Sequence, residues 1–378
     1  MSDSVPAPAE ALAPARDPAA LDPVNPLAPL DPLDLLVVGA GPTGIAIGAD
    51  ARRAGLSVLL VDRGPLTASI QEYPTFMEFF TTRERLEIAD IPFAIPEDKP
   101  TRRQALVYYR SVVERYGIPL ALFEEALEVR RDGEDFLVRS RPAAGWDAAA
   151  GAGPHGRLRR ARAVALATGY FAGNKRLGVA GEDLPWVRHR YREPYPHFAQ
   201  DVVIVGAGNT AAEAALDLWR NGARVTLVHR GAHVRPGVKY WLKPDIENRL
   251  AEGSIRARFN SVVRAFHEGA VEIETAGGPE SLPAQAAFVL IGYLPDVEFE
   301  RSCGVEVDPA TLIPAFDPET CESNVPGLYI AGTLQAGRYT DRIFIENSRD
   351  HGARIVRHLQ ARLAAAGPLL ATSRPNRG

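Results

Sequence analysis

The chain has 378 residues, which is long enough for two domains that each bury a core of their own. A formal net charge of −4 at pH 7 argues against nucleic acid or an anionic membrane as a partner, and 46% hydrophobic with 24% charged residues is typical of a soluble globular protein. No apolar run approaches the roughly 20 residues of a membrane span, and the sequence has neither a CxxC pair nor a metal-ligand pattern, so we predict a cytoplasmic protein without a metal.

The two ends of the chain show no periodic pattern. The first 31 residues are rich in Ala, Pro and Asp, and they lack the continuous apolar segment of a secretory signal. We therefore interpret residues 1–31 as a disordered leader and residues 367–378 as a disordered tail.

The first folded stretch has the order strand, Gly turn, helix and strand. An apolar strand leads into Gly39, Gly41 and Gly44, a helical run then ends at Gly55, and a second strand closes with Asp62. This is the dinucleotide-binding fingerprint, in which a Gly turn lets a pyrophosphate approach the backbone at the start of a helix. A carboxylate at the end of the second strand accepts hydrogen bonds from ribose hydroxyls, which favours the ADP half of FAD. The predicted FAD contacts in this stretch are Gly39, Gly41, Pro42, Thr43, Gly44 and Asp62.

The segment that follows contains an aromatic group and a second small-residue turn. Tyr73, Phe76, Phe79 and Phe80 either lie against the flavin ring or are ordinary core residues, and the sequence leaves both interpretations open. Further on, a buried strand ends in the triplet 167–169, where small residues allow backbone and cofactor to approach closely. This triplet adds Thr168 and Gly169 to the predicted FAD contacts.

A second copy of the fingerprint begins 167 residues after the first. Its turn contains Gly206 and Gly208, but its second strand ends in His229 and Arg230 instead of a carboxylate. A carboxylate would repel a ribose 2′-phosphate by about 4 kcal/mol per unit charge at 4 Å and an effective dielectric of 20, so the exchange favours NADP. Arg235 can close the other side of the phosphate; alternatively, His229 and Arg230 are solvated loop residues. The predicted NADPH contacts are Gly206, Gly208, Asn209, Thr210, His229, Arg230 and Arg235.

The closing segment returns the chain to the first domain. A strand ends at residues 331–333, and a long helix follows from about residues 341–345, with Ala353 and Val356 on its buried face. The positive N-terminal end of this helix would stabilise a reduced flavin ring, unless the helix serves packing alone. The predicted FAD contacts in this segment are Gly332, Thr333 and Phe344.

Several other segments complete the pattern. Apolar spacing predicts an amphipathic helix over Arg103–Tyr116, and a second helix is expected from Lys239 to Arg249. Residues 141–156 indicate an enlarged hairpin tip, and residues 185–200 a stiff linker. The two cysteines, at positions 303 and 321, lie in polar stretches that we interpret as surface turns.

These elements predict an α/β fold with two Rossmann-like, three-layer dinucleotide-binding domains. The NADPH domain is expected as an insertion into a split FAD domain. We place the FAD domain at residues 32–195 and 298–366, and the NADPH domain at residues 196–297.

With these residues assembled, the chain from about residue 32 to residue 366 resembles the thioredoxin-reductase-like flavoproteins, and among them the bacillithiol disulfide reductases of the YpdA type. Two of the supporting motifs, GAGPTG at 39–44 and GNTAAEAAL at 208–216, are shared by many flavoproteins. More specific are KPTRRQALVYYR at 99–110, GVKYWLKPDIENR at 237–249, and IAGTLQAGR with FIEN at 330–347. The resemblance implies NADPH-dependent reduction of the disulfide of bacillithiol, a glucosaminyl-malate-cysteine thiol. It also implies bacilliredoxin-type proteins as indirect partners.

The sequence departs from the related families at two places. Thioredoxin reductases carry a CxxC within the NADPH domain, whereas no cysteine occurs here before residue 303, so we expect thioredoxin not to be the substrate. YpdA-type proteins often have Cys where this chain has Thr43, and threonine cannot form a disulfide. The sequence therefore assigns no catalytic residue, and it leaves open whether the protein is a homo-oligomer.

Other functions stay open beside disulfide reduction. A flavin monooxygenase is one, because Phe171 and Gly173 begin an FxGxxxH motif, although Leu177 stands in place of its histidine. A reductase for a ferredoxin or another protein acceptor is a second, and a non-enzymatic NADPH sensor is a third.

Overall fold

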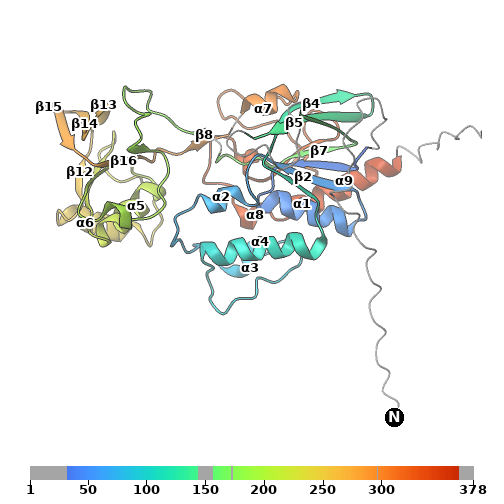
Figure 1. The fold of residues 1–378 in the computed structure, drawn as a ribbon, viewed down its shortest axis with the longest axis horizontal. Coiled ribbons are helices and arrows are strands. Elements are labelled where there is room, and N and C mark those ends of the chain that lie inside the picture. Colours follow the sequence, from blue (N-terminus) through green and yellow to red (C-terminus); the bar gives the residue numbers. More distant parts are fainter. Residues whose placement is uncertain (1–31, 144–155, 172, 296, 366–378) are drawn as a thin grey trace, which may run out of the picture.

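The computed structural model describes residues 32–143, 156–171, 173–295 and 297–365 (Figure 1). The predicted leader, the predicted tail and most of the expected hairpin tip lie outside these residues. No helix within the described ranges is long and apolar enough to cross a membrane.

The first domain is built on a five-stranded parallel sheet with the strand order β18-β7-β1-β2-β3. Its strands are β1 (Leu35–Val38), β2 (Val58–Asp62), β3 (Leu120–Leu122), β7 (Val164–Leu166) and β18 (Leu328–Ile330). Helices α1 (Pro42–Arg53), α4 (Arg102–Tyr116) and α9 (His351–Ala365) cover one face, with the short α2 (Ala68–Gln71), α3 (Arg83–Leu86) and α8 (Ile345–Ser348) nearby (Figure 1). The other face is covered by the antiparallel sheet β4 (Glu124–Asp132), β5 (Asp135–Pro142) and β6 (Arg157–Ala161).

Alternation along β1 shows why this sheet needs a layer on each face. Leu35 and Val37 pack with the helices, whereas Leu36 and Val38 pack with the antiparallel sheet, and each is at most 6% exposed. Because successive side chains of a strand point to opposite faces, both faces of this apolar strand must be buried. The result is the predicted three-layer domain.

The second domain repeats this design. Its parallel sheet has the order β12-β11-β10-β16-β9, with α5 and α6 on one side and an antiparallel sheet, β13-β14-β15, on the other. The parallel strands are β9 (Val187–Arg188), β10 (Asp201–Val205), β11 (Arg224–Val228), β12 (Arg256–Arg258) and β16 (Ala286–Val289). The other elements are α5 (Asn209–Arg220), α6 (Lys243–Ala251), β13 (Val262–His267), β14 (Ala270–Thr275) and β15 (Gly278–Pro283).

The second domain is an insertion into the first, as predicted. Every strand of the second parallel sheet lies in the chain between β7 and β18, which pair with each other in the first sheet. The chain crosses between the domains twice, and the crossings pair as the antiparallel strands β8 (Gly173–Asn174) and β17 (Tyr293–Leu294) (Figure 1). The boundary predicted at residue 196 stays a prediction; β9 precedes it and already belongs to the second sheet.

Two expected helices differ from the structure. The helix predicted from Lys239 begins at Lys243, because the Lys239 amide donates to Asn209 Oδ1 at 2.9 Å and holds the preceding residues in a turn. The long closing helix is divided into α8 and α9. Ser348 Oγ donates back to the Phe344 carbonyl at 2.7 Å, a type of bond that bends helices.

The register of α9 also differs from the expectation. Ala353 is exposed, and Gly352 instead faces α1, where a Cβ atom would lie 3.0 Å from the Ala46 backbone and 2.4 Å from Asp50 Oδ2. Val356 is buried as predicted. The absence of a side chain at Gly352 allows α9 to pack closely against α1.

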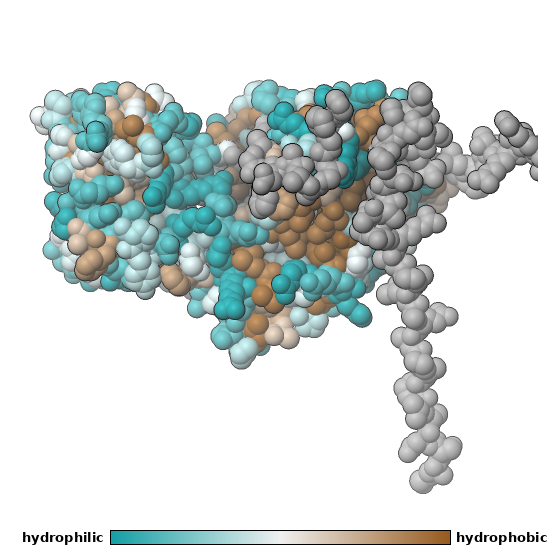
Figure 2. Space-filling view, viewed as in Figure 1, coloured by the Kyte–Doolittle hydropathy of each residue, from teal (hydrophilic) through white to brown (hydrophobic). Residues whose placement is uncertain are grey.

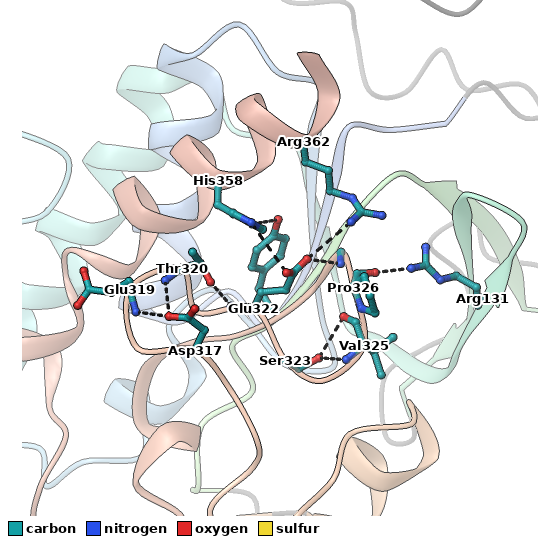
Figure 3. A network of polar contacts seen from close by, with 12 residues as sticks. Arg131, Asp317, Glu319, Thr320, Glu322, Ser323, Val325, Pro326, His358 and Arg362 are labelled. Atoms are coloured by element: carbon teal, nitrogen blue, oxygen red, sulfur yellow. Dashed lines mark hydrogen bonds and ion pairs between the residues drawn. The ribbon is translucent and has the colours of Figure 1, made fainter. Parts of the chain in front are cut away.

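The far end of α9 is held by the polar network in Figure 3. The Glu322 carboxylate accepts from the Gly327 amide at 2.6 Å and lies 3.8 Å from Arg362 and 3.9 Å from His358. His358 Nδ1 in turn lies 2.9 Å from the Tyr329 hydroxyl, at the centre of β18. The network thus fastens α9 to the strand whose end carries Gly332 and Thr333.

The two cysteines were expected in surface turns, and the expected surface position is wrong. Cys321 is 0% exposed and Cys303 is 7% exposed, each packed in a hydrophobic cluster of the first domain. Their polar neighbours in sequence face outward while the thiol itself fills the core, which is the usual environment of a free cysteine.

Candidate active site

The first Gly turn joins β1 to α1 and has a closed side and an open side. Gly39 has φ +117°, and a Cβ atom there would lie 2.4 Å from the Ala167 carbonyl oxygen. A Cβ atom at Gly44 would lie 2.0 Å from the Gly39 oxygen. At Gly41, by contrast, a Cβ atom would meet nothing within 4 Å. A side chain at Gly39 or Gly44 would therefore collide with neighbouring backbone, so these two positions require glycine. Gly41 instead borders open space, which fits a cofactor pyrophosphate.

Asp62 is held firmly at the end of β2. Its two carboxylate oxygens accept from the backbone amides of Ala40 at 2.7 Å and Gly64 at 2.8 Å. Burial raises the pKa of Asp62, and these two amide bonds oppose the rise. Each oxygen keeps a further lone pair, so the carboxylate is oriented by the protein and still able to accept from ribose hydroxyls.

The other predicted FAD residues meet beside this turn. A Cβ atom at Gly169 would lie 3.4 Å from Thr333 Oγ1, and one at Gly332 would lie 2.9 Å from Thr43 Oγ1. Thr43 Oγ1 is also 3.1 Å from Ser348 Oγ. The structure thus brings together four segments of the chain: the start of α1, the turn after β7, the turn after β18 and the end of α8.

A buried histidine, which the sequence analysis did not single out, supports this junction. The Gly332 amide donates to His351 Nδ1 at 3.1 Å. Burial lowers the pKa of His351 to about 4, so the ring is neutral at pH 7 and Nδ1 can accept. The hydrogen bond to His351 therefore holds the Gly332–Thr333 turn in place.

The second Gly turn has the same division. Gly206 has φ +134°, and a Cβ atom there would lie 2.4 Å from the Leu290 oxygen, whereas one at Gly208 would meet nothing within 4 Å. Asn209 follows at the start of α5, but its side-chain oxygen binds the Lys239 amide, so the Asn209 side chain positions a neighbouring turn. The open glycine again fits a pyrophosphate.

Beyond this turn lie the predicted phosphate-binding residues. His229 directly follows β11, and burial, together with Arg230 and Arg235, lowers its pKa. Among the described residues, Arg230 and Arg235 have no carboxylate within ion-pair distance. Two arginines without acidic partners beside a neutral histidine form a site suited to a phosphate group.

Both domains contribute to one cleft of about 1840 Å³. Its lining includes Gly208, Arg230 and Arg235 from the second domain, and Thr333 and Phe344 from the first. Ten lysines and arginines and six aspartates and glutamates line it, although acidic residues outnumber basic ones in the whole chain by 47 to 43. The cleft is therefore a positive region in a negatively charged protein, which favours anionic ligands.

The crossing between the domains adds a cation that sequence reasoning missed. Lys175 follows β8 and lines the same cleft. Burial lowers its pKa, and the nearby charges of Arg338, Arg235 and Arg230 lower it further. The order of elements alone gives no sign that these four residues share one region.

The aromatic residues after the first fingerprint all line the cleft, and they differ in how deeply they are buried. Phe79 is 5% exposed and belongs to the core, whereas Phe76 is 66% exposed. Tyr73 packs against Phe171 with ring centroids 5.3 Å apart, and Phe80 lines the cleft facing Phe344 at 5.9 Å. Contact of any of them with a flavin stays a prediction.

No cysteine lines the cleft. Burial raises the pKa of Cys303 to about 12 and also raises that of Cys321, so both side chains are neutral thiols at pH 7. Thr43 occupies the Gly turn itself, where it contacts Ser348. Chemistry in the cleft therefore has no protein thiolate to use.

Comparison with known proteins identifies the family. The model of the family "Pyridine nucleotide-disulphide oxidoreductase" matches residues 36–332. Bacilliredoxin reductase Bdr of Bacillus subtilis is 36% identical over 86% of this chain and 97% of its own length. Among solved structures, bacillithiol disulfide reductase Bdr (YpdA) of Bacillus cereus covers 88% of this chain and 100% of its own, at TM-score 0.83 and 33% identity. The Staphylococcus aureus protein of the same name covers 88% and 99%, at TM-score 0.80 and 34% identity.

These matches span both domains, and members of this family depend on FAD and NAD(P)H. The chain is accordingly a flavoprotein oxidoreductase acting on a thiol or disulfide. With its two Gly turns, its shared cleft and relatives of similar length at more than 30% identity, the chain belongs to the pyridine nucleotide-disulphide oxidoreductase family and, within it, to the Bdr (YpdA-type) reductases.

Proposed function

We propose that this protein uses NADPH to reduce a low-molecular-weight disulfide, bacillithiol disulfide, without a protein dithiol. One observation carries the proposal. A single positively charged cleft extends from the open Gly208 turn, past Arg230 and Arg235, to Thr333 and Phe344, and no cysteine lines it. Such a cleft admits anionic small molecules to both halves of the site, and it offers no thiol relay to a protein partner.

In the first domain, the chain's part is to bind and orient FAD. Gly41 leaves room for the pyrophosphate at the start of α1, Asp62 accepts from the ribose, and Thr168, Gly169 and Thr333 border the opposite side. When bound, FAD accepts a hydride from NADPH and supplies two electrons to a disulfide. Phe344 stands at the edge of the cleft, next to the Gly332–Thr333 turn that His351 supports.

In the second domain, the residues after β11 select NADPH over NADH. Arg230 and Arg235 supply permanent positive charge for the 2′-phosphate, and the neutral His229 can donate one hydrogen bond to it. Gly208 leaves room for the pyrophosphate, while Asn209 holds the turn that carries Lys239.

The substrate assignment rests on the relatives and on the absence of cysteine from the cleft lining. The relatives from Bacillus cereus and Staphylococcus aureus are named as bacillithiol disulfide reductases, and each is covered almost completely. Because no thiolate of this chain reaches the cleft, the two sulfur atoms of the substrate must both come from outside the protein. A bacilliredoxin is then an indirect partner through the bacillithiol pool, and the cytoplasm is the expected compartment.

Stopped-flow reoxidation tests the proposal. Flavin-loaded protein is reduced anaerobically with one equivalent of NADPH and mixed with bacillithiol disulfide, oxidised thioredoxin, oxidised ferredoxin or oxygen. We expect rapid reoxidation by bacillithiol disulfide, with two thiols released per flavin. Faster reoxidation by thioredoxin or ferredoxin, or a long-lived oxygen adduct, would replace this function by electron transfer to a protein or by monooxygenation. Protein that is colourless and cannot be reconstituted with FAD would remove the flavin assignment itself.

A further inference from the structure

Three segments far apart in sequence meet at one point of the cleft. They are residues 99–110, 237–249 and 330–347, and Phe80, from outside these segments, contacts Lys239 of the second and Phe344 of the third. Lys239 Nζ lies 3.3 Å from the centroid of the Phe80 ring and 5.4 Å from that of Trp241. Lys99 Nζ lies 5.8 Å from the Trp241 ring. We call Phe80, Lys99, Lys239 and Trp241 the lysine–aromatic cluster.

The cluster joins the two domains and faces the cleft. Phe80 and Lys99 come from the first domain, Lys239 and Trp241 come from the second, and all four line the cleft. The Phe80 and Trp241 ring centroids are 6.1 Å apart. On its other side Phe80 meets Phe344 edge-on at 5.9 Å, next to the predicted FAD residues. A ligand lying on the cluster would therefore extend toward Phe344 and Thr333, where FAD is expected.

The two lysines differ in how their charges are balanced. Lys239 Nζ is 3.7 Å from the Glu213 carboxylate, and burial lowers the pKa of Lys239. In the described part of the chain, Lys99 has no carboxylate within ion-pair distance. Lys99 therefore supplies positive charge that the protein does not neutralise, beside a lysine whose charge is partly shielded.

The aromatic surface adds a second kind of contact. Trp241 is 46% exposed, whereas tryptophan side chains are highly buried on average. A concave surface with exposed aromatic rings and a few well-placed charges is typical of a small-molecule site. Lysine side chains recognise carboxylates, and the face of an indole ring packs well against the C–H face of a sugar or another saturated ring.

We propose that the lysine–aromatic cluster is the subsite for the carboxylate-bearing, non-reacting arm of the disulfide substrate. The inference rests on the proposed reduction of a low-molecular-weight disulfide and specifies how the protein chooses among such compounds. Lys99 and Lys239 pair with carboxylates, and Phe80 and Trp241 pack against the rest of the arm. Binding energy from this arm holds the sulfur–sulfur bond beside the neighbouring FAD residues, Thr333 and Phe344.

Calorimetric titration of the full-length, flavin-loaded protein without NADPH tests this directly. The ligands are oxidised bacillithiol, which carries carboxylates, and cystamine, a cationic disulfide. The variants are Lys99→Gln, Trp241→Ala and the control Lys243→Gln, which alters a lysine of the same segment that pairs with Glu247 at 3.7 Å and does not line the cleft. Flavin content and Tm show whether each variant is folded.

We expect Lys99→Gln to raise the Kd of oxidised bacillithiol about ten-fold, since it removes one charge-assisted hydrogen bond, and not to raise the Kd of cystamine. Trp241→Ala should weaken both ligands, and Lys243→Gln neither. If wild-type protein binds and reduces oxidised bacillithiol while Lys99→Gln and Trp241→Ala leave its Kd unchanged, this subsite is wrong and the proposed function stands. If wild-type protein oxidises NADPH with ferricyanide but neither binds nor reduces oxidised bacillithiol, the proposed function fails, and this inference fails with it.

Discussion

At the scale of single residues, the two Gly turns separate what the fold needs from what a cofactor needs. The first glycine of each turn, Gly39 or Gly206, has positive φ and no room for a Cβ atom against the next strand. The second, Gly41 or Gly208, has free space around it. The fold thus requires glycine at the first position, and the space for a cofactor requires it at the second, two residues later.

This difference leads to a prediction for Gly39 and Gly41. Gly39→Ala should lower the free energy of unfolding by about 1–3 kcal/mol or more, because it adds backbone strain to a clash with the Ala167 oxygen. Gly41→Ala should fold with a Tm near that of wild-type apoprotein but bind FAD much more weakly, since its methyl group occupies the cofactor's space. Thermal unfolding of the apoproteins and flavin content after reconstitution check both. Equal loss of stability in the two variants would contradict the division.

A second residue-scale prediction concerns cofactor choice. Arg230→Ala should raise the KM for NADPH about ten-fold or more and change the KM for NADH little, because a charge-assisted bond to phosphate is lost only with NADPH. Arg264→Ala is the matched control, since Arg264 lines the same cleft but lies 3.8 Å from Glu274. Steady-state kinetics with both nucleotides provide the measurement. Equal changes for the two would mean that Arg230 does not contact the 2′-phosphate.

At the scale of elements, β18 and α9 are joined by the bond between the Gly332 amide and His351. The pKa of His351 is about 4 in the folded protein and 6.5 when unperturbed. As pH falls from about 6.5 toward 4, the unfolded chain gains a proton that the folded chain does not bind, so stability is lost over that window. The linkage of Asp50 has the opposite sign, because burial raises its pKa to about 6.

A comparison of wild type with His351→Asn separates the contribution of His351 to the pH dependence of stability from the contributions of Asp50 and other groups. Asparagine keeps an acceptor for the Gly332 amide but does not titrate. Between pH 7 and pH 4.5, wild type should lose about 2 kcal/mol more unfolding free energy than the variant, as expected from a shift of that size. Denaturant unfolding at each pH measures it. Parallel pH profiles would show that His351 is not the titrating group.

Elements with strong local signals were predictable from the sequence, and those decided by tertiary contacts were not. The helix expected over Arg103–Tyr116 begins at Arg102, since Thr101 and Gln104 form a capping box there, and the chain turns at Gly117 with φ 54°. The division between α8 and α9 depends instead on Ser348, whose hydroxyl contacts both Phe344 and the distant Thr43. Burial of Cys321 inside a polar stretch likewise depends on which side of the chain meets the core.

The candidate site shows the same limit. Both Gly turns and the basic residues after β11 were predicted because each is a local pattern with a physical role. Lys239 and Trp241 belong to a segment that the sequence marked as distinctive, but their meeting with Phe80 and Lys99 follows from the packing of the domains. The contact of Asn209 with a pyrophosphate stays a prediction, and no sequence pattern indicated that its side-chain oxygen accepts from the Lys239 amide.

At the scale of the whole molecule, the charge of the cleft opposes the charge of the protein. The chain carries −4 overall, yet basic residues outnumber acidic ones by ten to six in the cleft between the domains. Figure 2 shows a second-domain lobe that is mostly hydrophilic and hydrophobic residues gathered on the first-domain lobe, so the two lobes also differ in surface hydropathy. A charged substrate is attracted or repelled according to which electrostatic field is stronger where it approaches: the positive field of the cleft or the negative field of the whole protein.

Ionic strength distinguishes the two fields, because they predict opposite signs. Added salt weakens both fields, because the Debye length falls from about 30 Å at 0.01 M to about 8 Å at 0.15 M. If the positive field of the cleft is the stronger one, added salt should raise the KM of NADPH and of an anionic disulfide, and it should lower the KM of cationic cystamine. If the net charge of −4 dominates, salt should help the anions and hinder cystamine. Steady-state kinetics between these salt concentrations, with ferricyanide as acceptor when NADPH is varied, give the answer. Lys99→Gln should reduce the salt dependence for the anionic disulfide more than Lys243→Gln, because only the first of these lysines lines the cleft.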